Sequence, residues 1–367
     1  MAWDTTDTSD IDALLGTTLG GTQSDNYEQG ISGAAGVVKS DYAKLVSFQN
    51  VISYSMEEVL NTCPRKFQIA KLKANSAAGR DRINNVTFAF GHAVGAGVAV
   101  YDKTQDLQQA IFAAFLAWDI DLFAEDRGRA ASGDFKAKYD PKKSFAFAIW
   151  AIQKYAAFYE EYGMAAYEVV ELEATVCVDL QNSDEVSPST FHTGHVDELL
   201  RHRMTGKFKV KENKTTAFAT IDPAMYSNSN QATGYSVVVA QHGATDYDVL
   251  YTIYSSTEQR WVEFEFTKHE LARVEWLKTE LMQGEDVQRY AQANYFPKRG
   301  SACFKYSRQC EEYGSCDLNL DKQFGIKFKD LPVATMALLH EVEPFQYVVT
   351  KDQIVQSIRA SMKKDQS

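Results

Sequence analysis

The residues from Gly194 to Thr215 constrain the fold most strongly, because they predict a β-hairpin with charged side chains on its buried face. In the second half of this hairpin, three lysines alternate with Phe208 and Val210, which is the period-two pattern of a strand with one apolar face. Continuing the alternation puts Glu212 and Lys214 on the apolar face. Burying two ionised groups costs several kcal/mol each unless a partner compensates their charge. A bound metal ion would offset that cost.

The first half of the hairpin supplies a second carboxylate, Asp197. A turn at residues 204–205 places Asp197 opposite Glu212, whereas a turn at residues 205–206 places it opposite Lys214. Either register brings the three charged residues together. Two carboxylates beside a lysine form a hard-oxygen site that suits Mg²⁺ or Mn²⁺. The alternative is a solvated hairpin rich in lysine.

This arrangement, an aspartate followed on the next strand by Glu-x-Lys, resembles the PD-(D/E)XK nuclease superfamily. The resemblance implies an α/β fold with a restriction-endonuclease-like core, in which a mixed central β-sheet is flanked by helices. It also implies metal-dependent hydrolysis of phosphodiester bonds. Asp197 and Glu212 would then hold the metal ion together with the backbone carbonyl of Asn213, and Lys214 would position the attacking water.

The composition is that of a globular protein. The chain has 367 residues, of which 45% are hydrophobic and 12% aromatic, and this excludes a largely disordered chain. It contains no apolar run long enough to cross a membrane and no secretory signal pattern, so we expect a cytoplasmic protein, in the host cytoplasm if it is phage-encoded. The net charge of -11 argues against indiscriminate nucleic-acid binding, although local basic clusters could hold phosphates.

The sequence also predicts how the chain is organised. Residues 1–45 are rich in Gly, Ser, Thr and Asp and are expected to form a flexible acidic tail. A nuclease domain is expected at 53–316, divided into a helical part at 53–163, a catalytic core at 164–290 and a cysteine region at 296–316. Residues 317–367 are expected to form a C-terminal extension with a short helix at 351–362.

Local patterns predict the individual elements. Ser55 and Glu58 form a capping-box pattern at a helix start. Further helices are expected at 146–162, 223–239 and 268–290, and strands at 167–180, 246–254 and 261–267. An apolar stripe along the helix at 268–290 predicts its core-facing side, and its members are Leu271, Val274, Leu277 and Leu281.

Four cysteines lie at the two ends of the expected domain: Cys63, Cys303, Cys310 and Cys316. Cytoplasmic disulfides are not expected, so the thiols predict a metal site. The Ser-x-Ser motif and the Cys-Pro-Arg-Lys-Phe run at 63–67 resemble the start of RecB-type nucleases, including CRISPR-associated and phage exonucleases. That resemblance implies that the four cysteines hold a [4Fe-4S] cluster. Because their spacing is wide, zinc and free thiols remain alternatives.

Candidate DNA contacts come from two places. Gln231 and Tyr235 are four residues apart and share a helical face. The resembling family has Gln-x-x-x-Tyr after its Glu-x-Lys strand, where the amide bonds DNA and the ring stacks on a base. Arg65 and Lys66 are the other candidates, within the Cys-Pro-Arg-Lys-Phe run.

One family residue is missing. In the resembling family a glycine is followed four residues later by a metal-ligating histidine, but the fourth residue after Gly91 is Gly95. His92, about one helical turn from Gly95, is the candidate replacement, and an ordinary helix-start histidine is the alternative. Glu171 or Glu173 lies near the place where relatives carry an additional acidic residue.

The motifs together span residues 53–316 and imply a DNA exonuclease that depends on Mg²⁺ or Mn²⁺. It would act on single-stranded DNA or duplex ends in recombination, replication or DNA processing. The chain has no P-loop pattern, so a helicase or recombination or replication protein would be a separate partner. Two alternatives stay open: a catalytically weak DNA-binding or scaffold member of the same fold, and a zinc-stabilised protein-interaction module.

Overall fold

A computed structural model of the protein describes residues 45–47, 51–74, 86–118, 141–180, 191–241, 248–305, 308–331, 333–335 and 346–364. The expected flexible tail at 1–45 lies outside these residues, except for its last position. The chain divides into two compact units. Unit 1 comprises Met1–Arg80, Thr175–Gly194 and His269–Ser367, and unit 2 comprises Asp81–Ala174 and His195–Lys268.

The fold is α/β with a mixed seven-stranded sheet, as the sequence predicted at this level. The strand order is β11-β3-β4-β5-β6-β7, and β2 pairs with β4. The strands are β2 Val51–Ser53, β3 Tyr167–Asp179, β4 Phe191–His202, β5 Phe208–Thr216, β6 Asp248–Ser255, β7 Arg260–Thr267 and β11 Tyr347–Thr350. The β4–β5 and β6–β7 pairs are antiparallel, whereas β5–β6, β2–β4 and β11–β3 are parallel.

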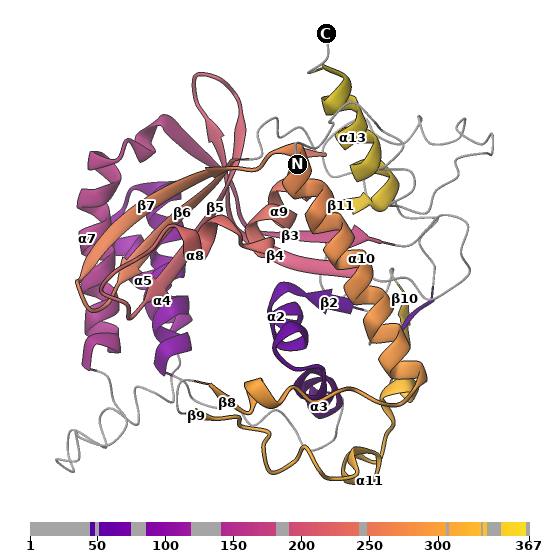
Figure 1. Ribbon diagram of the computed structural model, residues 1–367. Helices are drawn as coiled ribbons and strands as arrows, with labels where there is room; N and C mark the ends of the chain where they lie inside the picture. Colours follow the sequence, from indigo (N-terminus) through magenta and orange to yellow (C-terminus); the bar gives the residue numbers. More distant parts are fainter. Residues whose placement is uncertain are drawn as a thin grey trace, which may run out of the picture. The chain divides into compact units, whose positions relative to one another are not determined.

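In unit 2, helices cover both faces of the β5–β6–β7 strands. The helices are α4 Val86–Thr104, α5 Leu107–Ala117, α7 Phe145–Glu161, α8 Ala224–Ser227 and α9 Asn230–Ala240. Figure 1 shows α4, α5 and α7 packed beside one another. The Trp261 indole donates to the Ala151 carbonyl at 2.9 Å and so fixes α7 on β7. Helix α4 packs closely on β5 at Gly91, because a Cβ added to this glycine would lie 3.5 Å from the hydroxyl of Thr215 on β5.

Local sequence explains where these helices begin and break. The Asp106 carboxylate accepts the N–H groups of Gln108 and Gln109 and so caps α5. The expected helix at 146–162 is confirmed as α7. The expected helix at 223–239 is instead two helices, α8 and α9, which are interrupted at Asn228 and Ser229, residue types with low helix propensity.

In unit 1, three helices surround a small aromatic core. They are α2 Tyr54–Thr62, α3 Pro64–Ala74 and α10 Glu270–Gln292. Phe67, Phe296 and Phe328 stack with ring centroids 4.5 to 6.3 Å apart. Unit 1 also contains two short antiparallel strand pairs. One joins β1 Leu45–Ser47 to β10 Val333–Thr335, and the other joins β8 Phe304–Lys305 to β9 Arg308–Gln309. A short helix, α11 Leu320–Phe324, follows β9 in the chain.

The expected C-terminal extension is an integral part of unit 1. Its strand β11 pairs in parallel with β3 at residues 176–179, and the expected helix at 351–362 is α13 Lys351–Lys364, which packs against α10. Ile354 and Ile358 on α13 are buried. None of the helices in the described ranges combines the length and the apolarity needed to cross a membrane.

Two local predictions in unit 1 need correction. Helix α2 begins at Tyr54 with Ser53 as its N-cap, two residues before the expected cap at Ser55. The expected core-facing stripe of α10 is confirmed only in part: Leu277 is buried and Val274 and Leu281 are half-buried, but Leu271 is 57% exposed. Arg273 and Trp276 are buried as well, so the buried face of α10 is shifted from the predicted stripe.

Candidate active site

The β4–β5 hairpin sets the register of the candidate site. Glu198 pairs with Lys211 and Arg201 with Phe208, which is the register expected from a turn centred at residues 204–205. Continued by one residue, it places Asp197 opposite Glu212. There the Asp197 carboxylate accepts the backbone N–H of Asn213 at 2.8 Å. The backbone of β5 therefore holds Asp197 in place.

A chain of hydrogen bonds runs from β5 to α9 on this face of the sheet. Lys214 Nζ donates to Glu212 Oε2 at 2.7 Å and to Gln231 Oε1 at 3.1 Å. Gln231 Nε2 in turn donates to the Tyr235 hydroxyl at 3.3 Å. The structure thus brings the predicted carboxylates, lysine, glutamine and tyrosine together. Tyr235 is only 3% exposed, so its ring supports Gln231 and is not presented for base stacking as the sequence had suggested.

Burial and charge perturb the ionisable groups of this site. Desolvation, reinforced by the neighbouring Asp197 carboxylate, raises the pKa of Glu212 to about 8, although Lys214 opposes the shift. Desolvation also raises the pKa of Asp197, against the lowering effect of Lys214 and of the Asn213 N–H. Burial alone would lower the pKa of Lys214, but the Glu212 and Asp197 carboxylates outweigh it and raise that pKa. Lys214 is therefore a fixed positive charge.

The donor set at this site fits a divalent cation. Glu212 is fully buried, and its Oε1 atom has no hydrogen-bond partner among the described residues. A buried carboxylate oxygen without a partner is costly, and a cation would satisfy it. The oxygens of Asp197 and Glu212 are ligands of the hard kind that Mg²⁺ and Mn²⁺ prefer.

A third carboxylate approaches from β3. Glu173 has a positive φ of 49°, which is a strained conformation for a non-glycine residue inside a strand. Partial desolvation, followed by repulsion from Asp197, raises the pKa of Glu173. Of the two acidic residues considered on this strand, the structure therefore places Glu173 within the electrostatic reach of Asp197.

The structure does not place His92 among these groups. His92 is exposed on α4, and no group of three metal-ligating atoms that includes it occurs within the described residues. A Cβ at Gly95 would meet nothing within 4 Å, so that position has room for a side chain. The assignment of His92 as a metal ligand stays a prediction.

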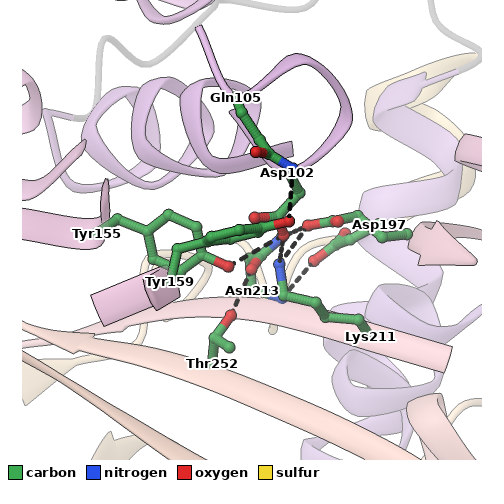
Figure 2. Close-up of polar contacts among 9 residues, drawn as sticks. Asp102, Gln105, Tyr155, Tyr159, Asp197, Lys211, Asn213 and Thr252 are labelled. Carbon is green, nitrogen blue, oxygen red and sulfur yellow. Dashed lines mark hydrogen bonds and ion pairs between the residues drawn. The ribbon is translucent and has the colours of Figure 1, made fainter. Parts of the chain in front are cut away.

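The opposite face of β5 carries a second polar group, which the sequence did not predict. Lys211 is fully buried, forms ion pairs with Asp102 of α4 and Glu198 of β4, and is shown in Figure 2. The Tyr155 hydroxyl of α7 donates to Asp102 at 3.0 Å. The alternative of a solvated lysine face is therefore wrong for Lys211, because α4 and α7 cover this face.

This second group reaches the candidate site through Asn213. The Asn213 side-chain amide donates to Glu198 at 2.7 Å, while its backbone N–H holds Asp197. The Thr252 hydroxyl donates to the Asn213 side-chain oxygen, as Figure 2 shows. Ligand-supporting groups of this kind fix the orientation of the residues that bind a metal. Desolvation, then repulsion from Asp102, raises the pKa of Glu198 to about 8.

The cysteine residues of the expected cluster all belong to unit 1. The β8–β9 register places Cys303 opposite Cys310, and the Cys310 N–H donates to the Cys303 carbonyl at 2.8 Å. A hairpin thus explains the wide gap between them. Burial raises the pKa of the Cys316 thiol, and the Cys310 and Cys63 thiols add to the shift. Within the described residues, no three cysteine sulfurs lie within 4.8 Å of one another.

Arg65 supports this cysteine region. Its guanidinium donates to the Cys316 carbonyl at 3.1 and 3.3 Å, to the Leu318 carbonyl at 3.1 Å and to Gln68 Oε1 at 2.7 Å. These bonds hold the loop at Cys316 against α3. The contacts of Arg65 are therefore structural ones, and its expected contact with DNA stays a prediction, as does that of the half-buried Lys66.

Comparisons with known proteins add little to this description. No family model and no curated protein matches the chain. A solved structure described as the crystal structure of SSO0001 overlaps 62% of this chain and 86% of its own, with 15% identity and a TM-score of 0.26. At that TM-score the overlap supports no conclusion about fold or function.

Proposed function

We propose that the protein is a divalent-metal-dependent deoxyribonuclease with a restriction-endonuclease-like core of the PD-(D/E)XK type. One observation carries the proposal: the Asp197 and Glu212 carboxylates, Lys214 and Gln231 converge on one face of the β4–β5 hairpin and α9. These residues arise from sequence motifs in the order that the resembling nucleases have. Mg²⁺ or Mn²⁺ is the cofactor that their oxygens suit.

In the proposed mechanism, each side chain has one task. Asp197 and Glu212, with the backbone carbonyl of Asn213, hold the cation. The cation supplies Lewis-acid stabilisation of charge on the scissile phosphate. Lys214 remains charged because both carboxylates raise its pKa, so it acts as a hydrogen-bond donor that orients water and phosphate oxygens. Gln231, half-buried beside Lys214, contacts the DNA strand through its amide.

The substrate is DNA, as single strands or duplex ends, and the reaction class is exonucleolytic hydrolysis in recombination, replication or DNA processing. A helicase or recombination protein would be a separate chain. The Asp197–Glu212 pair binds phosphate only through a cation, because two carboxylates alone repel it. Cleavage therefore depends on the divalent ion.

We further propose that Cys63, Cys303, Cys310 and Cys316 hold a [4Fe-4S] cluster with a structural role. The cysteine hairpin and the thiol–thiol effect on Cys316 support this. Cubane ligands bind four separate iron atoms, so they stand further apart than ligands that share one ion.

A second function is favoured by a specific observation at α4. The position of the family histidine is Gly95, and His92 is exposed and belongs to no group of three metal-ligating atoms found in the described ranges. A site with fewer ligands binds its cation more weakly. A DNA-binding or scaffold role on the same fold is therefore the alternative to catalysis, and a zinc-stabilised interaction module is the alternative if the cysteines bind zinc.

The test is cleavage of end-labelled single- and double-stranded DNA by anaerobically purified protein in Mn²⁺, Mg²⁺ or EDTA. We expect metal-dependent cleavage that Lys214→Ala reduces by about 10²-fold or more. Lys207→Ala, which removes an exposed lysine from the same hairpin, is the matched control. DNA binding without cleavage by folded wild-type protein would favour the scaffold role.

A further inference from the structure

Unit 1 contains a group of metal-ligating side chains of its own. It consists of Glu57 on α2, His192 on β4 and Glu280 on α10, and one ligand atom from each lies within 4.8 Å of the other two. Glu57 is 2% exposed, and His192 and Glu280 are 1% exposed. These three side chains are therefore buried away from water. Buried carboxylates and imidazoles are rarely found without a partner.

Hydrogen bonds within the group leave several of its atoms unused. His192 Nδ1 lies 3.0 Å from Glu280 Oε2, and Gln283 Nε2 donates to Glu57 Oε1 at 3.1 Å. His192 Nε2, Glu280 Oε1 and Gln283 Oε1 are buried without a hydrogen-bond partner in the described part of the chain. Each such atom costs about 1–3 kcal/mol. Three in one group indicate a ligand that the protein chain does not itself supply.

The charge of the group identifies the class of that ligand. Two buried carboxylates face one imidazole: Glu57 accepts from the side-chain amides of Gln283 and Asn61, and Glu280 lies against His192. A divalent cation compensates both and also coordinates the unused atoms. One imidazole nitrogen with carboxylate and amide oxygens is a donor set that Mn²⁺ and Zn²⁺ accept.

We propose that Glu57, His192 and Glu280 bind one structural divalent transition-metal ion, with Gln283 as the nearest further oxygen donor. Because all three ligands are at most 2% exposed, a substrate has no access to the ion, and its role is to hold the fold together. This site is separate in its residues from the proposed nuclease site, and it does not depend on that proposal.

The ion would join segments that are distant in the sequence. Strand β2 pairs with β4 at Ile52 and His192, and α2, which carries Glu57, follows β2 directly. Cys63 is the C-cap of α2. The proposed ion therefore restrains the first half of α2 on β4 and α10, whereas the proposed cluster would restrain its other end.

The test uses Mn²⁺ on the full chain with the nuclease site disabled by Glu212→Gln, purified anaerobically and then freed of divalent ions with a chelator. Mn²⁺ is the probe because thiolates prefer softer ions, so the cysteines do not compete. We expect one bound equivalent of Mn²⁺ and a rise of several degrees in Tm. Absence of both the equivalent and the rise would overturn the proposal.

Glu280→Gln, added to this parent, removes one charged ligand while keeping the shape of the side chain. We expect it to abolish the Mn²⁺-dependent rise in Tm and the bound equivalent. Glu285→Gln, an exposed change on the same helix, should leave both unchanged. If Glu280→Gln binds Mn²⁺ as the parent does, the ion is not at this site.

A spectroscopic measurement on the parent keeps the proposal testable even if Glu280→Gln fails to fold. Pulsed electron paramagnetic resonance of the bound Mn²⁺ should show coupling to one imidazole nitrogen, which His192 supplies. Mn²⁺ bound without nitrogen coupling would contradict the proposal.

Discussion

The backbone N–H of Asn213 donates to the Asp197 carboxylate at 2.8 Å, so the residue between Glu212 and Lys214 fixes the third charged residue of the candidate site. The side-chain amide of Asn213 donates to Glu198, the neighbour of Asp197. One residue therefore links the candidate metal site on one face of β5 to the buried Lys211 group on the other.

Lys211→Met should destabilise unit 2 strongly. Lys211 is fully buried between Asp102 and Glu198, and removing one partner of a buried ion pair leaves charges uncompensated, at a cost of about 3–5 kcal/mol. Urea unfolding followed by circular dichroism measures the change. Lys207→Met, at an exposed position, should change the unfolding free energy by less than about 0.5 kcal/mol. Equal stability of the two variants would show that the buried lysine is not needed.

Glu212 should make the metal-free protein less stable as the pH rises. Its folded pKa of about 8 lies above the ordinary glutamate pKa of 4.5, so between these values the folded state holds a proton that the unfolded state has lost. The unfolding free energy therefore falls with increasing pH across this window. Unfolding in EDTA at pH 5 to 8 tests this, and Glu212→Gln should flatten the slope. An unchanged slope would mean that Glu212 titrates normally.

Cys316→Ser should remove the broad visible absorbance expected of an iron–sulfur cluster. Burial and the nearby Cys310 and Cys63 thiols raise the pKa of the Cys316 thiol, so Cys316 is within electrostatic reach of both ends of the proposed ligand set. Iron content and the visible spectrum of anaerobic protein measure the effect. Cys177→Ala, at a buried strand position, should retain the spectrum. Colourless wild-type protein with bound zinc would replace the cluster with a zinc site.

Local alternation was sufficient to predict the grouping of Asp197, Glu212 and Lys214, because strand parity depends only on neighbouring residues, but it left two hairpin registers open. It was insufficient for Lys211, whose partners Asp102 and Glu198 are 109 and 13 residues away. Strand parity predicted on which face of β5 Lys211 lies, but it could not predict that α4 and α7 cover that face.

The buried group in unit 1 shows the same limit. Glu57, His192 and Glu280 come from three segments and follow no short motif, so the sequence gives no spacing by which to find them. The apolar stripe of α10 was correct only in part for a related reason, because it included the exposed Leu271 and left out the buried Trp276. Trp276 and Glu280 are buried by their tertiary partners, and helical periodicity does not encode those partners.

The most direct test of the nuclease assignment compares Mn²⁺-dependent DNA cleavage by the wild type and Asp197→Asn. The amide keeps the size of the side chain and an oxygen that can accept the Asn213 N–H, but it removes the charge that would hold the cation. We predict a fall in cleavage rate of about 10²-fold or more with an unchanged unfolding midpoint. Equal cleavage by the two proteins would contradict the proposed site.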